Sequence, residues 1–175
     1  SGLFWSIDSL YKVTFTGGAT NWSYSNIASD LSIVSKKSVV EYDGAFYWPG
    51  IDRFYVATAS GAQELPNTFN SNYFLENLNY TYSSKVWGTK IPRFGEIWWF
   101  FPSGTSTECD HAVVYNVREK FWYDLPISRT CGSHPISSRY PIWADSNRIY
   151  LHEHGMNEVT DTEELAIRSS FTSAT

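Results

Sequence analysis

The sequence predicts an all-β fold built from β-propeller blades, and three observations lead to this prediction. Aromatic residues account for 18% of the 175 residues, and aromatic and β-branched side chains favour strands over helices. Apolar runs are short throughout the chain and are separated by turn signals. An aromatic strand recurs about every 40–50 residues, which is the period of a propeller blade. Its four copies begin at Leu3, Ala45, Glu96 and Tyr140.

The repeat divides the chain into about four antiparallel meander sheets within a single propeller domain or propeller fragment. The expected units are 1–37, 38–84, 85–135 and 136–175. A meander leaves an apolar face on each side, and stacking of successive copies covers both faces. This burial explains why residues 97–101 are apolar without alternation. Both ends of the chain look cut, so we expect a piece of a larger ring rather than a small closed ring. A β-sandwich with aromatic sheets is the alternative architecture.

Each unit begins with strand signals that are punctuated by turns. In the first unit, residues 10–15 and 21–27 follow residues 3–7 and alternate apolar and polar side chains, as half-buried strands do. In the second unit, Asp43-Gly44 is a strong hairpin turn between residues 38–42 and 45–48. Pro49-Gly50 then ends the second strand before residues 53–58.

The remaining units follow the same pattern, with two short helical segments. The third unit has expected strands at 85–89, 96–101, 112–116 and 120–124. The fourth unit has them at 140–144, 148–153 and 167–174. Residues 70–78 are expected to form a turn or two of helix with apolar side chains on one face. Residues 160–164 resemble a helix start with acidic residues in the first turn.

Composition excludes several function classes. The net charge of −5 argues against a dedicated nucleic-acid binder, whose signature is a basic stripe. No apolar run approaches the roughly 20 residues of a membrane-spanning helix. Two cysteines, Cys109 and Cys131, are too few for a disulfide scaffold. They could pair, but two reduced and unpaired thiols are favoured.

Two clusters contain residue types that bind metals. Cys109, His111, Cys131 and His134 supply two thiols and two imidazoles, which zinc accepts in a tetrahedron. Their spacing is not that of a standard zinc finger, so we expect no metal there. His152 and His154 would share one face of a strand, but no third ligand is visible, and ordinary polar positions are favoured.

No catalytic signature emerges, so we expect no enzyme activity, no catalytic residue and no cofactor. The repeated Ser-x-Asp-x-Gly-x-x-Trp turns of sialidase-like chains are absent from the sequence. Glu96 lies beside Trp98 and Trp99 and could serve a glycosidase, but the sequence places no second carboxylate at a defined distance. The expected role of the tryptophans is packing within and between blades. The packing positions are Trp48, Trp87, Trp98, Trp99, Trp122 and Trp143.

The second to fourth units carry a pattern that looks like the propeller region of structural proteins in the tails of short-tailed bacteriophages. Its segments are DGAFYWPGIDRFY at 43–55, GEIWWFFP at 95–102, VYNVREKFWYD at 114–124 and YPIWAD at 140–145. The resemblance covers about residues 3–172, and its motifs are blade-packing residues.

The resemblance implies a virion protein of the tail, a nozzle, hub or DNA-stabilisation component that is made in the host cytoplasm. It implies a homo-oligomeric ring in contact with other virion structural proteins, around a channel that DNA passes without specific binding. Two other classes remain open: a carbohydrate-binding or glycoside-cleaving propeller, and a host protein-interaction propeller.

Overall fold

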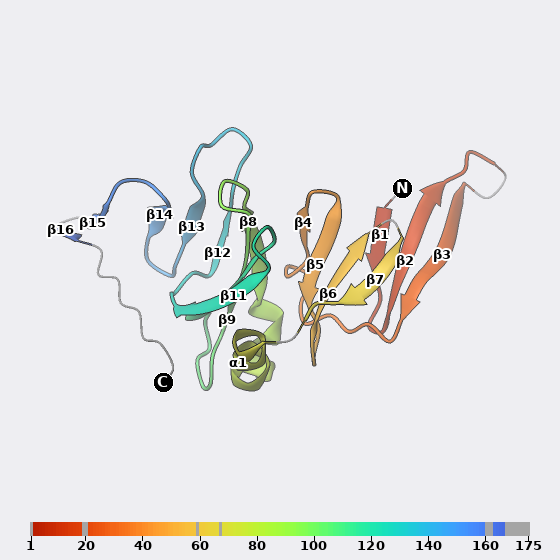
Figure 1. Ribbon diagram of the computed structural model, residues 1–175, viewed down its shortest axis with the longest axis horizontal. Helices are drawn as coiled ribbons and strands as arrows, with labels where there is room; N and C mark the ends of the chain where they lie inside the picture. Colours follow the sequence, from red (N-terminus) through yellow and green to blue (C-terminus); the bar gives the residue numbers. More distant parts are fainter. Residues whose placement is uncertain (1, 19–20, 59, 67, 160–162, 167–175) are drawn as a thin grey trace.

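The chain folds into a row of antiparallel sheets that follow one another along the longest axis of the molecule (Figure 1). The computed structural model describes residues 2–18, 21–58, 60–66, 68–159 and 163–166. The strands of the first two sheets are β1 (Gly2–Trp5), β2 (Ser9–Phe15), β3 (Trp22–Ser29), β4 (Val40–Tyr42), β5 (Ala45–Pro49), β6 (Phe54–Thr58) and β7 (Gly61–Glu64). The later strands are β8 (Trp87–Ile91), β9 (Glu96–Phe101), β10 (His111–Asn116), β11 (Phe121–Pro126), β12 (Cys131–Ser133), β13 (Ile142–Ala144), β14 (Ile149–Leu151), β15 (Asn157–Val159) and β16 (Glu164–Ala166).

Each sheet is a meander in which consecutive strands are neighbours. The first sheet is β1-β2-β3, the second β4-β5-β6-β7, the third β8-β9-β10-β11 and the fourth β12-β13-β14, followed by the hairpin β15-β16. More than two sheets pack face to face in succession, which excludes a sandwich. The predicted all-β fold of propeller blades is therefore confirmed. The described sheets form an open arc, because the first and the fourth sheet lie at opposite ends of the molecule (Figure 1).

Three apolar clusters fill the spaces between successive sheets. Trp48 and Leu10 belong to the cluster between the first and second sheets. Trp99 belongs to the cluster between the second and third sheets, and Trp143 to the cluster between the third and fourth. The middle strands are buried on both faces because each face meets a different neighbouring sheet; every residue from Ile97 to Phe101 is buried. Burial of one large aromatic side chain contributes about 2–3 kcal/mol, so these rings hold blade to blade.

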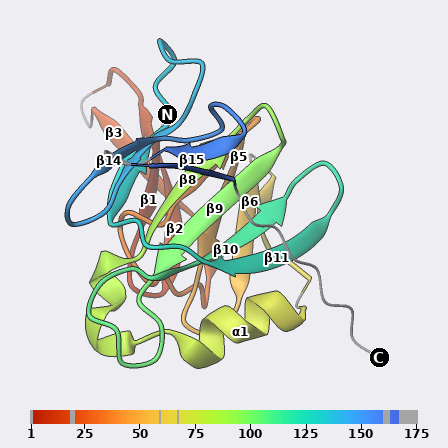
Figure 2. The same cartoon turned by 90° about the vertical axis from the view of Figure 1, so that its left-hand side faces the viewer.

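The sheets fan out from their first strands, as propeller blades do. The first strands β4, β8 and β12 lie against one another in turn. Farther out, α1 (Phe69–Asn77) fills the widening space beside β10 and β11 (Figure 2). Phe74 of α1 is fully buried in the cluster between the second and third sheets. The Thr68 hydroxyl caps this helix by accepting a hydrogen bond from the backbone N–H of Ser71. A 3-10 helix, Tyr80–Lys85, then leads into β8.

Among the described residues, no strand fills the innermost position of the first sheet. Its strand β1 lies opposite the second strand of the next blade, because the Trp5 ring packs edge-on against Phe46 and Trp48 of β5 at 5.8 and 5.6 Å between centroids. Its last strand, β3, lies against β7, the fourth strand of that blade. The first sheet therefore fills the second to fourth strand positions. In the fourth sheet, β12 lies against β8, so that sheet fills the first to third positions.

The turn chemistry follows the sequence closely at the β4–β5 hairpin. Asp43 and Gly44 both have positive φ values, 49° and 78°, as a two-residue hairpin of this kind requires. Glu41 reinforces the turn by accepting a hydrogen bond from the Gly44 N–H at 2.9 Å.

Several predicted boundaries are corrected by the structure. Residues 131–133 fall in the predicted third unit, 85–135, yet they pair with β13 and begin the fourth sheet. Cys131-Gly132-Ser133 carries no apolar pattern, which is why the sequence does not mark it as a strand. The predicted strand 148–153 ends at Leu151, with His152 and Glu153 in a turn. Of the predicted helix start at 160–164, Glu164 begins a strand. Residues 160–162 and the predicted strand 167–174 lie outside the described residues.

Candidate interaction surface

One face of the first sheet carries large apolar side chains that no sheet of the described structure covers. Phe4, Phe15, Trp22 and Tyr24 are 59%, 61%, 54% and 68% exposed. Cross-strand pairing places them on one face, because Phe4 pairs with Tyr11, Val13 with Tyr24, and Phe15 with Trp22. We call this the β1–β3 end face. Its members are Phe4, Tyr11, Val13, Phe15, Trp22 and Tyr24.

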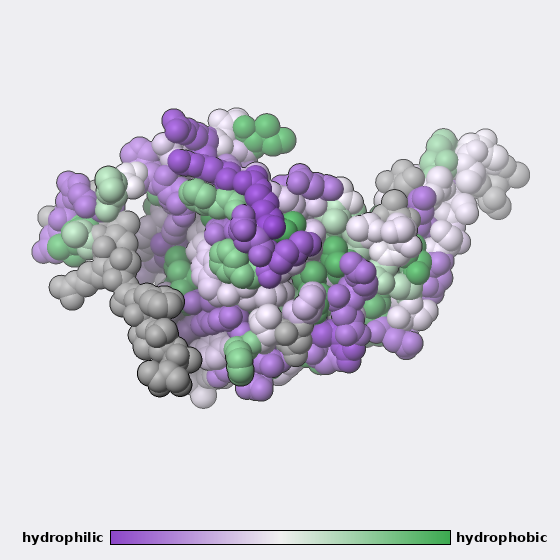
Figure 3. All heavy atoms as spheres, in the orientation of Figure 1, coloured by the Kyte–Doolittle hydropathy of each residue, from purple (hydrophilic) through white to green (hydrophobic). Residues whose placement is uncertain are grey.

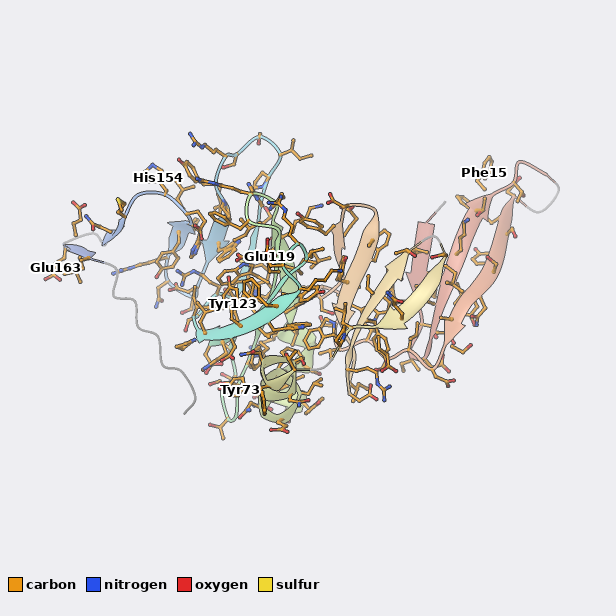
Figure 4. All side chains as sticks on the ribbon, viewed as in Figure 1. Phe15, Tyr73, Glu119, Tyr123, His154 and Glu163 are labelled. Atoms are coloured by element: carbon orange, nitrogen blue, oxygen red, sulfur yellow. The ribbon has the colours of Figure 1, made fainter. Side chains whose placement is uncertain are left out.

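The β1–β3 end face lies at one extremity of the molecule. Phe15 lies near the tip of β2, at the end of the molecule opposite the fourth sheet (Figure 4). Pale and hydrophobic residues predominate around that tip in the space-filling view (Figure 3). Phe15 and Trp22 pack edge to face at 5.2 Å, which organises this part of the surface.

The internal repeat shows what covers the same face in other blades. Phe4 and Tyr11 pair on neighbouring strands as Trp48 and Tyr55 do in the second sheet. Trp48 and Tyr55 are 0% and 3% exposed because the first sheet lies over them. Phe4 is 59% exposed because no preceding sheet lies over it in the described structure.

A second uncovered face lies at the other end of the arc. On β13 and β14, Ile142, Ile149 and Leu151 are 38%, 78% and 50% exposed, whereas Trp143, on the opposite face of β13, is buried at 1%. We call this surface the β12–β14 end face. Its members are Cys131, Ser133, Ile142, Ala144, Ile149 and Leu151, which share a face by strand alternation.

The weak metal-ligand candidates of the sequence form no metal-binding group in the described part of the chain. Cys109 is buried and its thiol donates to the backbone carbonyl of Lys85 at 3.4 Å, whereas Cys131 is exposed on the fourth sheet. The two cysteines are free thiols. His111 contacts Ser103 and Tyr73, and no group of three or more His, Cys, Asp or Glu side chains among the described residues could hold a metal ion. Burial, followed by the charges of Glu108 and Asp110, raises the pKa of the Cys109 thiol to about 12.

A serine, a histidine and an aspartate meet where the loop after β9 joins the start of β10. The Ser103 hydroxyl donates to Asp110 at 2.9 Å and lies 3.2 Å from His111 Nδ1. In a nucleophilic triad the carboxylate would hold the histidine and the histidine would take the serine proton, but here the serine bonds the carboxylate directly. Burial works to raise the pKa of Asp110, yet hydrogen bonds from Ser106 and Ser103 outweigh it and leave this pKa lowered. The cluster therefore ties the loop together, and sequence reasoning missed it because Ser103 reads as a turn residue.

The structure brings a second carboxylate, that of Glu153, into electrostatic range of Glu96, which the sequence did not show. Glu96 accepts hydrogen bonds from the Tyr123 hydroxyl at 2.8 Å and from the Trp98 indole at 3.0 Å, so both of its oxygens are occupied. Glu153 remains largely accessible, but packing around its carboxylate and then the charge of Glu96 raise its pKa, against the opposing effect of Arg93. Burial and the bond to Glu96 raise the pKa of Tyr123 in turn. Trp98 is 7% exposed, so it offers no open platform for a sugar ring.

His152 and His154 differ from the predicted pair on one strand face. Both lie beyond the end of β14. His152 packs against Trp143, with ring centroids 4.1 Å apart, and its Nε2 accepts a hydrogen bond from Arg129 at 2.8 Å. Burial and the charge of Arg129 lower the pKa of His152 to about 4. His154 packs edge-on against Tyr140 instead.

The six tryptophans expected to pack the blades are all buried. Their exposed fractions are 8% or less: Trp48, Trp87, Trp98, Trp99, Trp122 and Trp143. A cleft of about 470 Å³ opens at the edge of this packing, between the second and third sheets. Tyr47, Tyr115 and Trp122 line it together with the polar side chains of Glu64 and Lys120. Burial raises the pKa of both tyrosines.

Comparisons with known proteins add a distant likeness among solved structures. No helix in the described part of the chain is long and apolar enough to cross a membrane. No family model matches the sequence, and a search of curated proteins finds no match. Among solved structures, the chain is similar to the WD40 domain of Neurospora crassa Pan2, at 12% identity and a TM-score of 0.41. The match covers 79% of this chain and 40% of that chain, so this chain spans less than half the length of that neighbour.

Proposed function

We propose that the chain is a non-enzymatic structural protein of a tailed-bacteriophage virion, a tail, nozzle or hub component that assembles as a ring around the DNA channel. The observation that carries the proposal is the pair of uncovered end faces on an arc of propeller blades. A contiguous exposed apolar surface of more than a few hundred Å² marks an interaction site on a soluble protein. The blade-packing motifs resemble those of phage tail proteins, so we infer that this surface serves the assembly of a virion.

The charge balance supports a role beside a DNA channel. Each Lys or Arg that contacts a phosphate releases counterions and adds affinity, so a channel that passes DNA works best without a basic surface. The chain has 13 Lys and Arg residues against 18 Asp and Glu residues, for a net charge of −5. Three of its basic side chains also pair with acidic ones: Lys90 with Glu41, Lys85 with Glu108, and Arg53 with Asp52 and Glu64.

Composition of purified virions tests the proposal directly. Mass spectrometry of gradient-purified particles of the encoding phage is expected to detect this chain at a stoichiometry typical of a tail ring. Antibody labelling is expected to place it on the tail. Particles that are infectious and complete without the chain would refute the proposal.

A carbohydrate-binding or glycoside-cleaving propeller is the second candidate, favoured by the carboxylates of Glu96 and Glu153. A raised pKa on one of two neighbouring carboxylates is the property that a glycosidase acid requires. Glycan-array binding or release of reducing sugar, lost in Glu153→Gln, would support this function. Absence of both activities in the wild-type protein would eliminate it.

A further inference from the structure

We propose that the β12–β14 end face of one copy of this chain covers the β1–β3 end face of a second copy, in a head-to-tail contact that continues the row of blades. This inference rests on the proposed function and names the partner of the uncovered surface. Each copy offers one face of each kind, so the contact can repeat from copy to copy and closes into a ring where the rotation allows it.

The chain already contains this type of contact three times. In each one, the face of a sheet that corresponds to the β1–β3 end face packs against the opposite face of the preceding sheet. Trp48, Trp99 and Trp143 mark that face in the second, third and fourth sheets, and each is 0–1% exposed. The first sheet presents the same face with Phe4 and Tyr11, and no sheet of the described structure precedes it. The fourth sheet presents the complementary face, and the described residues add only the two-stranded hairpin β15-β16 after it.

The two end sheets have two of the four strand positions of a blade in common, and apolar side chains of both end faces lie on these strands. The first sheet fills the second to fourth positions of a blade, and the fourth sheet fills the first to third. The second and third positions are therefore present on both sides: β1 and β2 in one copy, β13 and β14 in the other. Phe4 and Tyr11 occupy these positions on one face, and Ile142, Ile149 and Leu151 occupy them on the other.

Charge and size agree with a contact between the two faces. Neither set of face positions includes a charged side chain, so neither face would leave a buried charge unpaired. Large aromatic side chains bury about 150–250 Å² each. The four that are more than half exposed therefore offer on the order of 500 Å² on one partner, against about 800 Å² per partner in a stable interface. The remaining face positions contribute the rest.

Cysteine cross-linking tests the geometry. An added Cβ at Gly88 would lie 2.6 Å from Val40, so the pair Val40–Tyr47 of the second sheet lies level with the pair Gly88–Trp99 of the third. Ile142 precedes Trp143 as Tyr47 precedes Trp48, so the repeat places Ile142 opposite Phe4 of the next copy. Under mild oxidation the Phe4→Cys/Ile142→Cys/Cys131→Ser variant is expected to form disulfide-linked oligomers. The two variants with only one new thiol, Phe4→Cys/Cys131→Ser and Ile142→Cys/Cys131→Ser, are expected not to.

Sedimentation velocity over a range of concentrations provides the second measurement. The wild-type chain is expected to assemble as concentration rises. Phe4→Lys and Tyr24→Lys are expected to raise the concentration of half-assembly at least about tenfold. Ile7→Lys changes an exposed residue, 88% accessible, outside the face and serves as the matched control, which is expected to assemble as the wild type does.

The outcomes separate this inference from the proposed function. If the wild-type chain stays monomeric and the variant with both new thiols forms no cross-link, yet the chain is found in virions, the head-to-tail contact alone is overturned. Cross-links that form with only one of the two new thiols show a symmetric contact and also overturn it. A chain that assembles head to tail but is absent from virions supports the contact and refutes the virion role.

Discussion

Trp99 of β9 donates its indole N–H to the backbone carbonyl of Ser38 at 2.7 Å, across the interface between the second and third sheets. The neighbouring interface has an equivalent bond, from the Trp48 indole to the backbone carbonyl of Ser32 at 3.0 Å. Each tryptophan therefore fills the space between two blades and also satisfies a carbonyl in the segment that precedes β4. Apolar burial and a directional hydrogen bond together set how one blade seats on the next.

The bond from Trp99 to Ser38 predicts that Trp99→Phe destabilises the protein more than Trp143→Phe does. Both indoles are buried, at 0% and 1% exposure, but the Trp143 N–H has no hydrogen-bond partner in the described structure. Loss of volume is thus matched, and only Trp99→Phe leaves a carbonyl unpaired. We expect a difference of about 1–3 kcal/mol in the free energy of unfolding, measured by urea denaturation. Equal losses would show that the hydrogen bond contributes nothing.

Gly88 of β8 is predicted to tolerate no side chain. It pairs with Trp99, and an added Cβ would lie 2.8 Å from the Trp99 ring and 2.6 Å from Val40 of the second sheet. Gly88→Ala would force two packed blades apart, so we expect a loss of about 1–3 kcal/mol, as for an overpacked core. Gly18→Ala, where an added Cβ meets nothing within 4 Å, is the control and should change thermal stability little. Equal melting temperatures for the two variants would contradict this account.

His152 is predicted to make stability fall in mild acid. Its pKa drops from 6.5 to about 4 on folding because of burial and the Arg129 charge, so the unfolded chain binds more protons than the folded chain between these values. Stability is therefore complete above about pH 6.5 and declines as the pH falls towards 4. For a half-buried ring we expect no more than about 2 kcal/mol.

Urea denaturation at a series of pH values measures this effect. His152→Gln, whose amide oxygen can accept the Arg129 bond, should flatten the slope between pH 6.5 and 4. His154→Gln removes an exposed imidazole two residues later and should keep the slope. A wild-type slope that survives in His152→Gln would assign the pH dependence to other groups.

The two cysteines are predicted to differ strongly in reactivity. Cys131 is exposed, whereas Cys109 is 1% exposed and burial raises its thiol pKa to about 12. Because the thiolate is the nucleophile, a thiol reagent at neutral pH should modify one cysteine of the folded chain and both after unfolding. Peptide mapping should locate the first label at Cys131. Rapid labelling of Cys109 under native conditions would show that the interface between the third and fourth sheets opens.

The strands that the sequence predicted well are those whose pattern reflects burial. Residues 96–101 read as a strand covered on both faces, and β9 spans the same residues. Strands without large apolar side chains were missed, because their place is set by pairing with a neighbour. Gly61–Glu64 and Cys131–Ser133 are of this kind, and each joins a sheet through its partner strand.

The candidate surface could be only partly predicted from the sequence. Phe4, Trp22 and Tyr24 lie in segments that the sequence predicted as strands, but a periodic pattern shows which face is apolar and not whether another sheet covers it. Likewise, Glu153 is 57 residues from Glu96 along the chain, and only the meeting of the third and fourth sheets brings their charges into range. The weak candidates for metal ligands, where the sequence predicted no metal, also differ in their surroundings, because Cys109 is buried before β10 of the third sheet and Cys131 is exposed on the fourth.

The sequence by itself determined the repeated aromatic meander, because turn residues and apolar spacing act locally along the chain. Tertiary structure alone decided that the described sheets form an open arc and that its two end faces stay bare. The reason is that burial of a sheet face depends on contacts between segments distant in sequence, which no local pattern encodes.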